Sequence, residues 1–258
     1  MQDYHDLRKF NIVMGFIHLF QSLLILILHI LDGTIIEIPI ITRFLSADVT
    51  DDQWGFQTDI VFDFPVVWGA ALFLLMSAIA HLLIASVFYS KYETNIKNGM
   101  NSARWYEYAI SSSFMIAIIV LLGGVYDLSA LIAIFALNAI MNLMGLVMEK
   151  HNQLTEKTDW TSYNIGVFAG LIPWIIATIY FIGTINNSAD LIPDYALLSF
   201  LVLFIFYNTF AFNMFFQYKK IGPWKDYLFG EKMYIVLSLV SKSALSWIIF
   251  IGATLALS

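Results

Sequence analysis

Seven long apolar stretches, separated by shorter polar segments, dominate the pattern of residues along the chain. A helix that crosses a bilayer needs about 20 mostly apolar residues, and each stretch is long enough. We predict spanning helices at residues 10–31, 65–89, 102–125, 128–148, 161–184, 192–216 and 233–256. Because these helices use most of the chain, we predict one domain over residues 1–258, an all-α membrane protein built as a seven-helix bundle.

The connection between the first two predicted helices is long enough to hold structure of its own. It contains two stretches rich in β-branched or aromatic residues, 34–38 and 56–62, with a polar turn region at 51–55 between them. Such a pattern predicts a small β-hairpin outside the membrane. The hairpin is either a lid on the bundle or a contact in an oligomer, and the sequence favours neither.

The composition agrees with a membrane protein and excludes several other classes. The chain is 60% hydrophobic and only 12% charged, whereas a soluble domain carries about 25% charged residues. An ordinary soluble globule, a disordered chain and a nucleic-acid binder are therefore excluded, and membrane lipid is the expected surrounding. The absence of cysteine excludes disulfides, thiolate metal sites and a cysteine nucleophile. No hydrolase, kinase or metal-binding pattern is present, so we do not expect an enzyme.

The positive charges predict the orientation of the bundle. Of the 13 lysines and arginines, all except Arg43 and Lys242 lie in alternate segments of the chain. These segments precede the first predicted helix and join the second to the third, the fourth to the fifth, and the sixth to the seventh. Under the positive-inside rule they face the cytoplasm. We therefore expect a multi-pass protein of the cell membrane with a cytoplasmic amino terminus and an outer carboxyl terminus.

Two charged residues inside the predicted helices are the main candidates for function. Lys242 lies about 15 Å inside the last helix, too deep for its side chain to reach either surface easily. Glu107 lies about 8 Å inside the third helix. Charges at such depth usually mark a functional site. A buried cation and a buried anion in neighbouring layers are best explained as a pair.

Histidines and serines add polar groups at a similar depth. His18 and His81 lie at matching depths in the first two helices, which suggests a polar pocket beneath the charged pair. Taken singly, each histidine is as readily explained as a hydrogen-bonded structural residue. Ser77 shares a helix face with His81, and Ser238 shares one with Lys242, whose nitrogen its hydroxyl can hydrogen-bond.

The opposite half of the predicted bundle is poor in ionisable groups. No ionisable residue follows Lys242 in the last helix, and none lies between Glu107 and Asp127. The fifth helix has no carboxylate along its length. A pump needs protonatable groups on both sides of its switch, so this one-sided distribution argues against pumping.

A lysine amine in an apolar pocket is a good nucleophile for carbonyl carbon and forms Schiff bases. Seven apolar helices, a lysine in the middle of the last one and a carboxylate in the third are typical of a retinal protein with a rhodopsin-like fold. The protonated Schiff base is a cation, and Glu107 is the available counterion. Trp174 and Tyr207 are candidates for packing against the ring, although ordinary core packing explains either one better.

The segments around these residues resemble the heliorhodopsin family over nearly the whole chain. The most specific are residues 104–113 and 234–247. Weaker support comes from residues 10–11, 15–21, 77–81, 134–139, 149–150 and 172–174. A cytoplasmic amino terminus, read here from the charges, is the feature that distinguishes this family from other rhodopsins.

The resemblance implies a role for each candidate. Lys242 would carry all-trans retinal covalently as a protonated Schiff base, with Glu107 as its sole carboxylate counterion and Ser238 hydrogen-bonding nearby. A hydrated cavity beside the Schiff base would be lined by His18, Ser77 and His81. The retinal pocket would be lined by Tyr108, Ser112, Met115, Asn138, Met141, Gly145, Trp174 and Tyr207. Tyr207 departs from the phenylalanine of relatives, which puts the colour in doubt but not the chromophore.

The resemblance also implies the activity. Light would isomerise the retinal to the 13-cis form in a slow photocycle without net ion pumping, and the output would be sensory or regulatory. The family further implies a homodimer, in which the first outer hairpin touches the partner, and an unidentified cytoplasmic signalling partner.

Two alternatives of a different class stay open. The protein is alternatively a light-driven transporter or a light-gated ion or proton channel. A retinal-free receptor or scaffold is a third interpretation, in which Glu149, Lys219 and Lys220 touch a soluble partner. For these three residues, however, we expect solvated helix ends.

Overall fold

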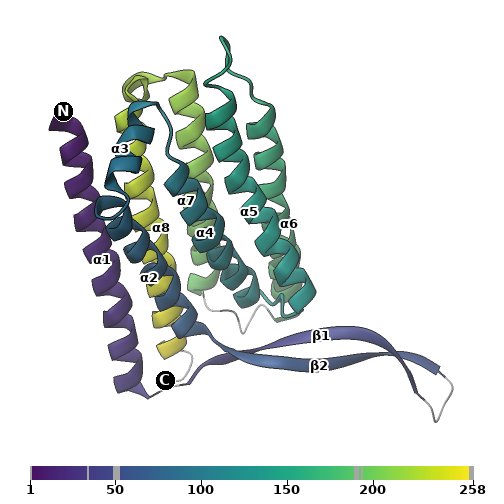
Figure 1. Ribbon diagram of the computed structural model, residues 1–258. Helices are drawn as coiled ribbons and strands as arrows, with labels where there is room; N and C mark the ends of the chain where they lie inside the picture. The colour runs from purple at the N-terminus through teal and green to yellow at the C-terminus, as the bar shows by residue number, and fades with distance from the viewer. Residues whose placement is uncertain (1, 34, 49–52, 189–191, 193, 256–258) are drawn as a thin grey trace.

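Seven apolar helices lie side by side, and a two-stranded hairpin extends from one end of the bundle (Figure 1). The computed structural model describes residues 2–33, 35–48, 53–188, 192 and 194–255. Within that part of the chain, seven helices are long and apolar enough to cross a membrane. The predicted fold class, a seven-helix membrane bundle with a small hairpin, is therefore confirmed.

The spanning helices follow the predicted ranges closely. They are α1 (Gln2–Asp32), α2 (Val66–Ala85), α4 (Ser102–Leu122), α5 (Leu128–His151), α6 (Thr161–Ser188), α7 (Asp194–Lys219) and α8 (Tyr227–Leu255). The largest difference is at α1, which begins well before the predicted residue 10 because its polar first turns continue the helix beyond the apolar stretch. A further short helix, α3 (Tyr89–Lys97), was not predicted, because hydropathy does not detect a polar helix outside the membrane.

The two ends of the bundle differ in content (Figure 1). The N-terminus, α3 and the α5–α6 and α7–α8 connections lie at one end, which we call the amino-terminal end. The C-terminus and the hairpin lie at the other, the hairpin end. Since the predicted orientation places the lysine-rich connections in the cytoplasm, the amino-terminal end corresponds to the predicted cytoplasmic face.

The hairpin consists of β1 (Glu37–Asp48) and β2 (Gln53–Pro65), paired antiparallel. β2 contains the predicted residues 56–62 and extends beyond them, whereas β1 shares only Glu37 and Ile38 with the predicted residues 34–38 and continues far past them. A bulge interrupts the register between Ile40 and Ile41. The predicted turn residues Asp51 and Asp52 lie outside the described residues. Ile40 is buried against the bundle, and the backbone N–H of Ile41 donates to the carbonyl of Tyr126 at 2.9 Å. These contacts attach the base of the hairpin to the α4–α5 connection.

Side-chain caps set where α4 and α5 begin. The Asn101 side chain accepts a hydrogen bond from the backbone N–H of Arg104 at 3.1 Å, and Asp127 caps α5 in the same way. Such caps satisfy the free N–H groups of a first helical turn. The cap at Asn101 determines the position of Arg104 and, one turn further on, of Glu107.

Candidate functional site

The Lys242 side chain is almost fully buried and is surrounded by acceptors from two other helices. Its Nζ donates to Glu107 Oε1 at 2.7 Å, to Ser111 Oγ at 2.8 Å and to Ser77 Oγ. An ammonium group has three N–H donors, so all three are used. Ser77 Oγ in turn donates to Glu107 Oε1 at 2.7 Å. The ion pair and two hydroxyls therefore form a closed polar centre inside an apolar bundle.

Ser111 was not selected from the sequence, whereas Ser238 was. The hydroxyl of Ser238 makes no hydrogen bond to Lys242, and Ser111 holds the third position around the amine. The sequence carried a signal for Ser111, since it lies four residues after Glu107 and shares its helix face.

The two histidines lie together beside this centre. The rings of His18 and His81 are stacked, with centroids 5.7 Å apart and planes inclined by 10°. His81 Nδ1 is 2.8 Å from Asn11 Oδ1, while neither ring nitrogen of His18 has a partner among the described residues. A cavity of about 30 Å³ is lined by His81 and Glu107 among others, and it is large enough to hold a water molecule.

On the other side of Lys242, a polar network joins α4, α5 and α7. The Asn138 amide donates to Ser112 Oγ at 2.9 Å and to Ser113 Oγ at 3.0 Å. The Tyr207 hydroxyl bonds to Asn138 Oδ1, and the Asn142 amide donates to Ser112 Oγ at 2.9 Å. Of this network, Ser113 and Asn142 were not predicted from the sequence. The spacing of Asn138 and Asn142, four residues apart in an apolar helix, was an available signal.

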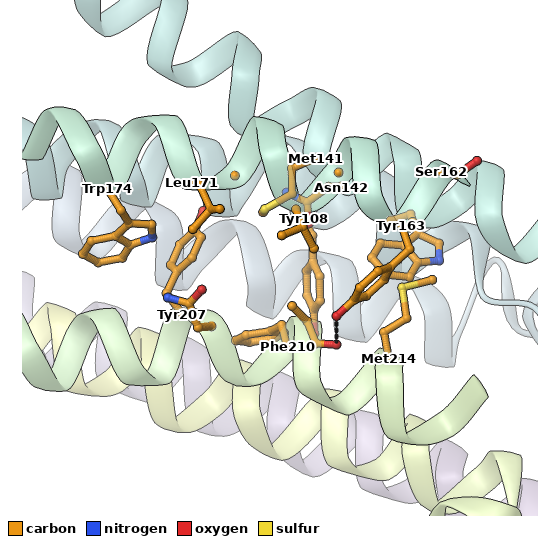
Figure 2. A pocket seen from close by; sticks show the side chains of 17 residues that line it. Tyr108, Met141, Asn142, Ser162, Tyr163, Leu171, Trp174, Tyr207, Phe210 and Met214 are labelled. Atoms are coloured by element: carbon orange, nitrogen blue, oxygen red, sulfur yellow. Dashed lines mark hydrogen bonds between the residues drawn. The ribbon is translucent and has the colours of Figure 1, made fainter. Parts of the chain in front are cut away.

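An elongated cavity begins near Lys242 and continues between α4, α5, α6 and α7. Its first part, about 30 Å³, is lined by Lys242, Tyr108, Ser112, Met115, Met141, Asn142, Tyr207 and Phe210, with Ser241. The larger part, about 90 Å³, shares five of these residues and extends to Trp174 and Met214. Figure 2 shows Trp174 at one end of this larger part and Tyr163 and Met214 at the other.

Close approach of side chains to glycine backbone shapes this cavity. A Cβ at Gly145 would collide with the Trp105 ring, and one at Gly170 would collide with Met141. Trp174 packs edge-on against Tyr207, with ring centroids 5.5 Å apart. The two glycines therefore make room for large side chains that form the cavity walls.

The chemistry of these residues fits a carbonyl ligand with a long apolar chain. A buried primary amine with a carboxylate partner stands at the head of the cavity, and aromatic and methionine side chains line the rest. The cavity is smaller than the ~300 Å³ at which ligand pockets begin. Binding such a ligand therefore requires lining side chains to move, and Met141, with three rotatable bonds, is well suited to do so.

The structure corrects the expectation of solvated helix ends at Glu149. Glu149 is 2% exposed, and its carboxylate pairs with Arg104 and accepts the backbone N–H of Asn101 at 2.9 Å. Arg104 also pairs with Glu231, which is 1% exposed and accepts the Asn101 amide at 2.7 Å. We call Arg104, Glu149 and Glu231 the ionic triad. The ionic triad is therefore a second buried charged centre, besides the pair of Lys242 and Glu107.

Among the buried residues that the structure describes, ionisable groups lie unevenly along the bundle. The histidine pair and the ionic triad lie on the amino-terminal side of Lys242. His29, in the last turn of α1 at the hairpin end, is also buried, at 9% exposure. The hairpin half of the bundle is therefore poor in such groups but not without them.

A family model described as Heliorhodopsin matches residues 7–254 of the chain, which include the hairpin and all seven spanning helices except the first residues of α1 and the last residue of α8. A comparison with curated proteins gives no match.

Proposed function

The chain belongs to the heliorhodopsin family, and we propose that it senses light through retinal attached covalently to Lys242. Membership in this family makes the protein a retinal-binding, light-sensing rhodopsin of the membrane, consistent with its seven apolar helices. The observation that carries the finer proposal is the buried Lys242 amine, paired with Glu107 at the head of an apolar cavity.

Glu107 serves as the counterion in this proposal. A Schiff-base nitrogen keeps a single proton, so it can hold only one of the three acceptors that now surround Lys242 Nζ. Glu107 is the only charged acceptor among them, and a charge-assisted bond is about twice as strong as a neutral one. Ser77, which already donates to Glu107, and Ser111 then hydrogen-bond the carboxylate and hold Glu107 in place.

Bound all-trans retinal supplies the chemistry, which is absorption of visible light and isomerisation to the 13-cis form in a slow cycle. The proton that leaves Lys242 Nζ is received by the group formed by Glu107, His18 and His81, and it returns from there. This group lies on the amino-terminal side of the nitrogen, and the hairpin half offers few groups that could accept the proton next. We therefore propose no net ion transport and a sensory or regulatory output.

The proposal includes the arrangement of the protein in the membrane. The amino-terminal end faces the cytoplasm, because the lysines and arginines of the connections gather there. The whole chain acts as one domain, and two copies form a homodimer in which the hairpin touches the partner. A cytoplasmic partner reads the signal.

The test is pigment formation by full-length protein given all-trans retinal. Wild type should acquire a visible absorption band that hydroxylamine bleaches, and K242A should not. K150A, at an exposed lysine of α5, is the matched control and should form the normal pigment. An unchanged band in K242A would refute the attachment site. A robust light-driven pH change in cell suspension, abolished by a protonophore, or a photocurrent would refute the absence of transport.

A further inference from the structure

A second large cavity opens at the amino-terminal end, away from the chromophore site. It has a volume of about 310 Å³ and lies between the ends of α5 and α7, the short helix η2 (Gly222–Lys225) and the start of α8. It shares no lining residue with the elongated cavity beyond Lys242. Ligand pockets have volumes of about 300 to 1,000 Å³, so a small organic molecule fits it.

One wall of this cavity carries two lysines, Lys220 and Lys225. Neither ammonium group has an ion-pair partner among the residues that the structure describes. Trp224 lies between them in the chain and also lines the cavity. Its ring nitrogen donates to Asn213 at 2.6 Å and thereby fixes the indole. The wall therefore combines two unpaired positive charges with an ordered aromatic surface.

The backbone at Lys220 is strained. Lys220 has a φ of 53° and is the only non-glycine residue with positive φ in the described part of the chain. It follows the last turn of α7, where its N–H donates to the Gln217 carbonyl at 3.2 Å. Glycine is favoured at this position, and a residue with a Cβ costs roughly 1–2 kcal/mol there. Strain of this kind often accompanies function, and here it places an ammonium group at the cavity.

Glu149 also lines the cavity, and its carboxylate is already paired within the ionic triad. Glu156 of the α5–α6 connection also lines the cavity, and its carboxylate has no ion-pair partner among the described residues. A ligand that contacts Lys220 and Lys225 is attracted by two cations and repelled by Glu156. Since Glu149 is compensated by Arg104, two cations stand against one unpaired carboxylate, and this excess of positive charge favours a small anion.

A chain of polar groups joins this cavity to the chromophore site. Glu149 borders the cavity and bonds to Arg104. Arg104 and its other partner, Glu231, line the small internal cavity that Glu107 also lines. Arg104 and Glu107 are three residues apart on α4, so they lie on neighbouring positions of one helix face. A change of charge at Lys242 therefore acts on the ionic triad, and through it on the cavity.

We propose that this cavity is an effector site for a small organic anion with a carboxylate or phosphate group, and that binding there is coupled to the state of the pigment. The proposal that an anion binds depends only on the cavity, whereas the proposal of coupling also depends on the proposed function. Coupling between two sites is reciprocal. The anion therefore changes the absorption maximum or the lifetime of the photocycle, and illumination changes the affinity for the anion.

Isothermal titration of the full-length protein in detergent tests the site, with succinate and inorganic phosphate as probes and succinamide as the uncharged control. Saturable binding of either anion is expected, without binding of succinamide. K220G relieves the backbone strain and removes one cation, so it should keep the fold and weaken binding about tenfold, or 1.4 kcal/mol. E156Q should strengthen binding because it removes a repulsive charge. K150Q, at an exposed lysine outside the cavity, should bind as wild type does.

Repeating the titrations on the same proteins with bound retinal distinguishes the proposal of anion binding from the proposal of coupling to the pigment. Absence of saturable binding, or unchanged affinity in K220G, would overturn the effector site even where the pigment forms normally. Binding without any shift of the absorption maximum or of the photocycle lifetime would overturn the coupling. Binding by a protein that forms no pigment would refute the proposed function but leave the anion site intact.

Discussion

Replacing Arg104 with glutamine should destabilise the protein strongly, because Arg104 is the single cation between two buried carboxylates. All three side chains of the ionic triad are at most 5% exposed. Removing one partner of a buried ion pair costs about 3–5 kcal/mol, since it leaves a charge without compensation. A change of 1 kcal/mol moves the melting temperature of a chain of this size by about 2–4 °C. R104Q should therefore melt about 6–20 °C below wild type.

The matched controls are E149Q and E231Q, each of which removes one negative charge of the ionic triad instead of its positive charge. The ionic triad holds one positive and two negative groups, so neutralising either carboxylate leaves one balanced pair with Arg104. Each control should melt within a few degrees of wild type. Thermal unfolding in one detergent, followed by circular dichroism, measures all four proteins. A loss in E149Q and E231Q as large as in R104Q, or a loss of less than ~2 °C in R104Q, would refute this account of the charges.

Three further substitutions test the chromophore site. E107Q should move the visible band of the pigment to longer wavelength, because the anion that stabilises the ground-state cation is lost; an unshifted or blue-shifted band would contradict this. Y207F should lower the melting temperature, since a buried network left one donor short loses about 1–3 kcal/mol. G145A should cost about 1–3 kcal/mol by overpacking against Trp105 and should slow retinal uptake. G183A, where a Cβ meets no neighbour, is its control and should be neutral or stabilising.

The spanning helices were predictable because a single property, apolar length, specifies them. The hairpin was predictable in kind from its β-branched and aromatic residues, but its extent was not. Its first strand continues through Arg43, which pairs with Thr58, and lies almost entirely beyond the predicted residues 34–38. The short helix α3 was not predicted, because its sequence is polar and the other helices were located by their apolar pattern.

The ionic triad could not be predicted, because its members come from three helices and lie at the margin of each apolar stretch. In the sequence, Arg104, Glu149 and Glu231 resemble charges at solvated helix ends. Only the packing of α4 against α5 and α8 brings them together and buries them. Lys242 and Glu107 were recognisable because each stands alone within an apolar stretch, where a charge is costly.

The two charged centres satisfy their buried charges with different chemistry, and this difference suits them to different tasks. Around Lys242 two of the three acceptors are hydroxyls, which can donate as well as accept. Ser77 already donates to Glu107, so the carboxylate keeps a hydrogen bond when the nitrogen loses its proton. Arg104 has no such freedom, because a guanidinium in a protein stays protonated and only donates. The centre around Lys242 can therefore change charge without breaking its packing. At the ionic triad, whose cation keeps its charge, the same event changes only the local electric field.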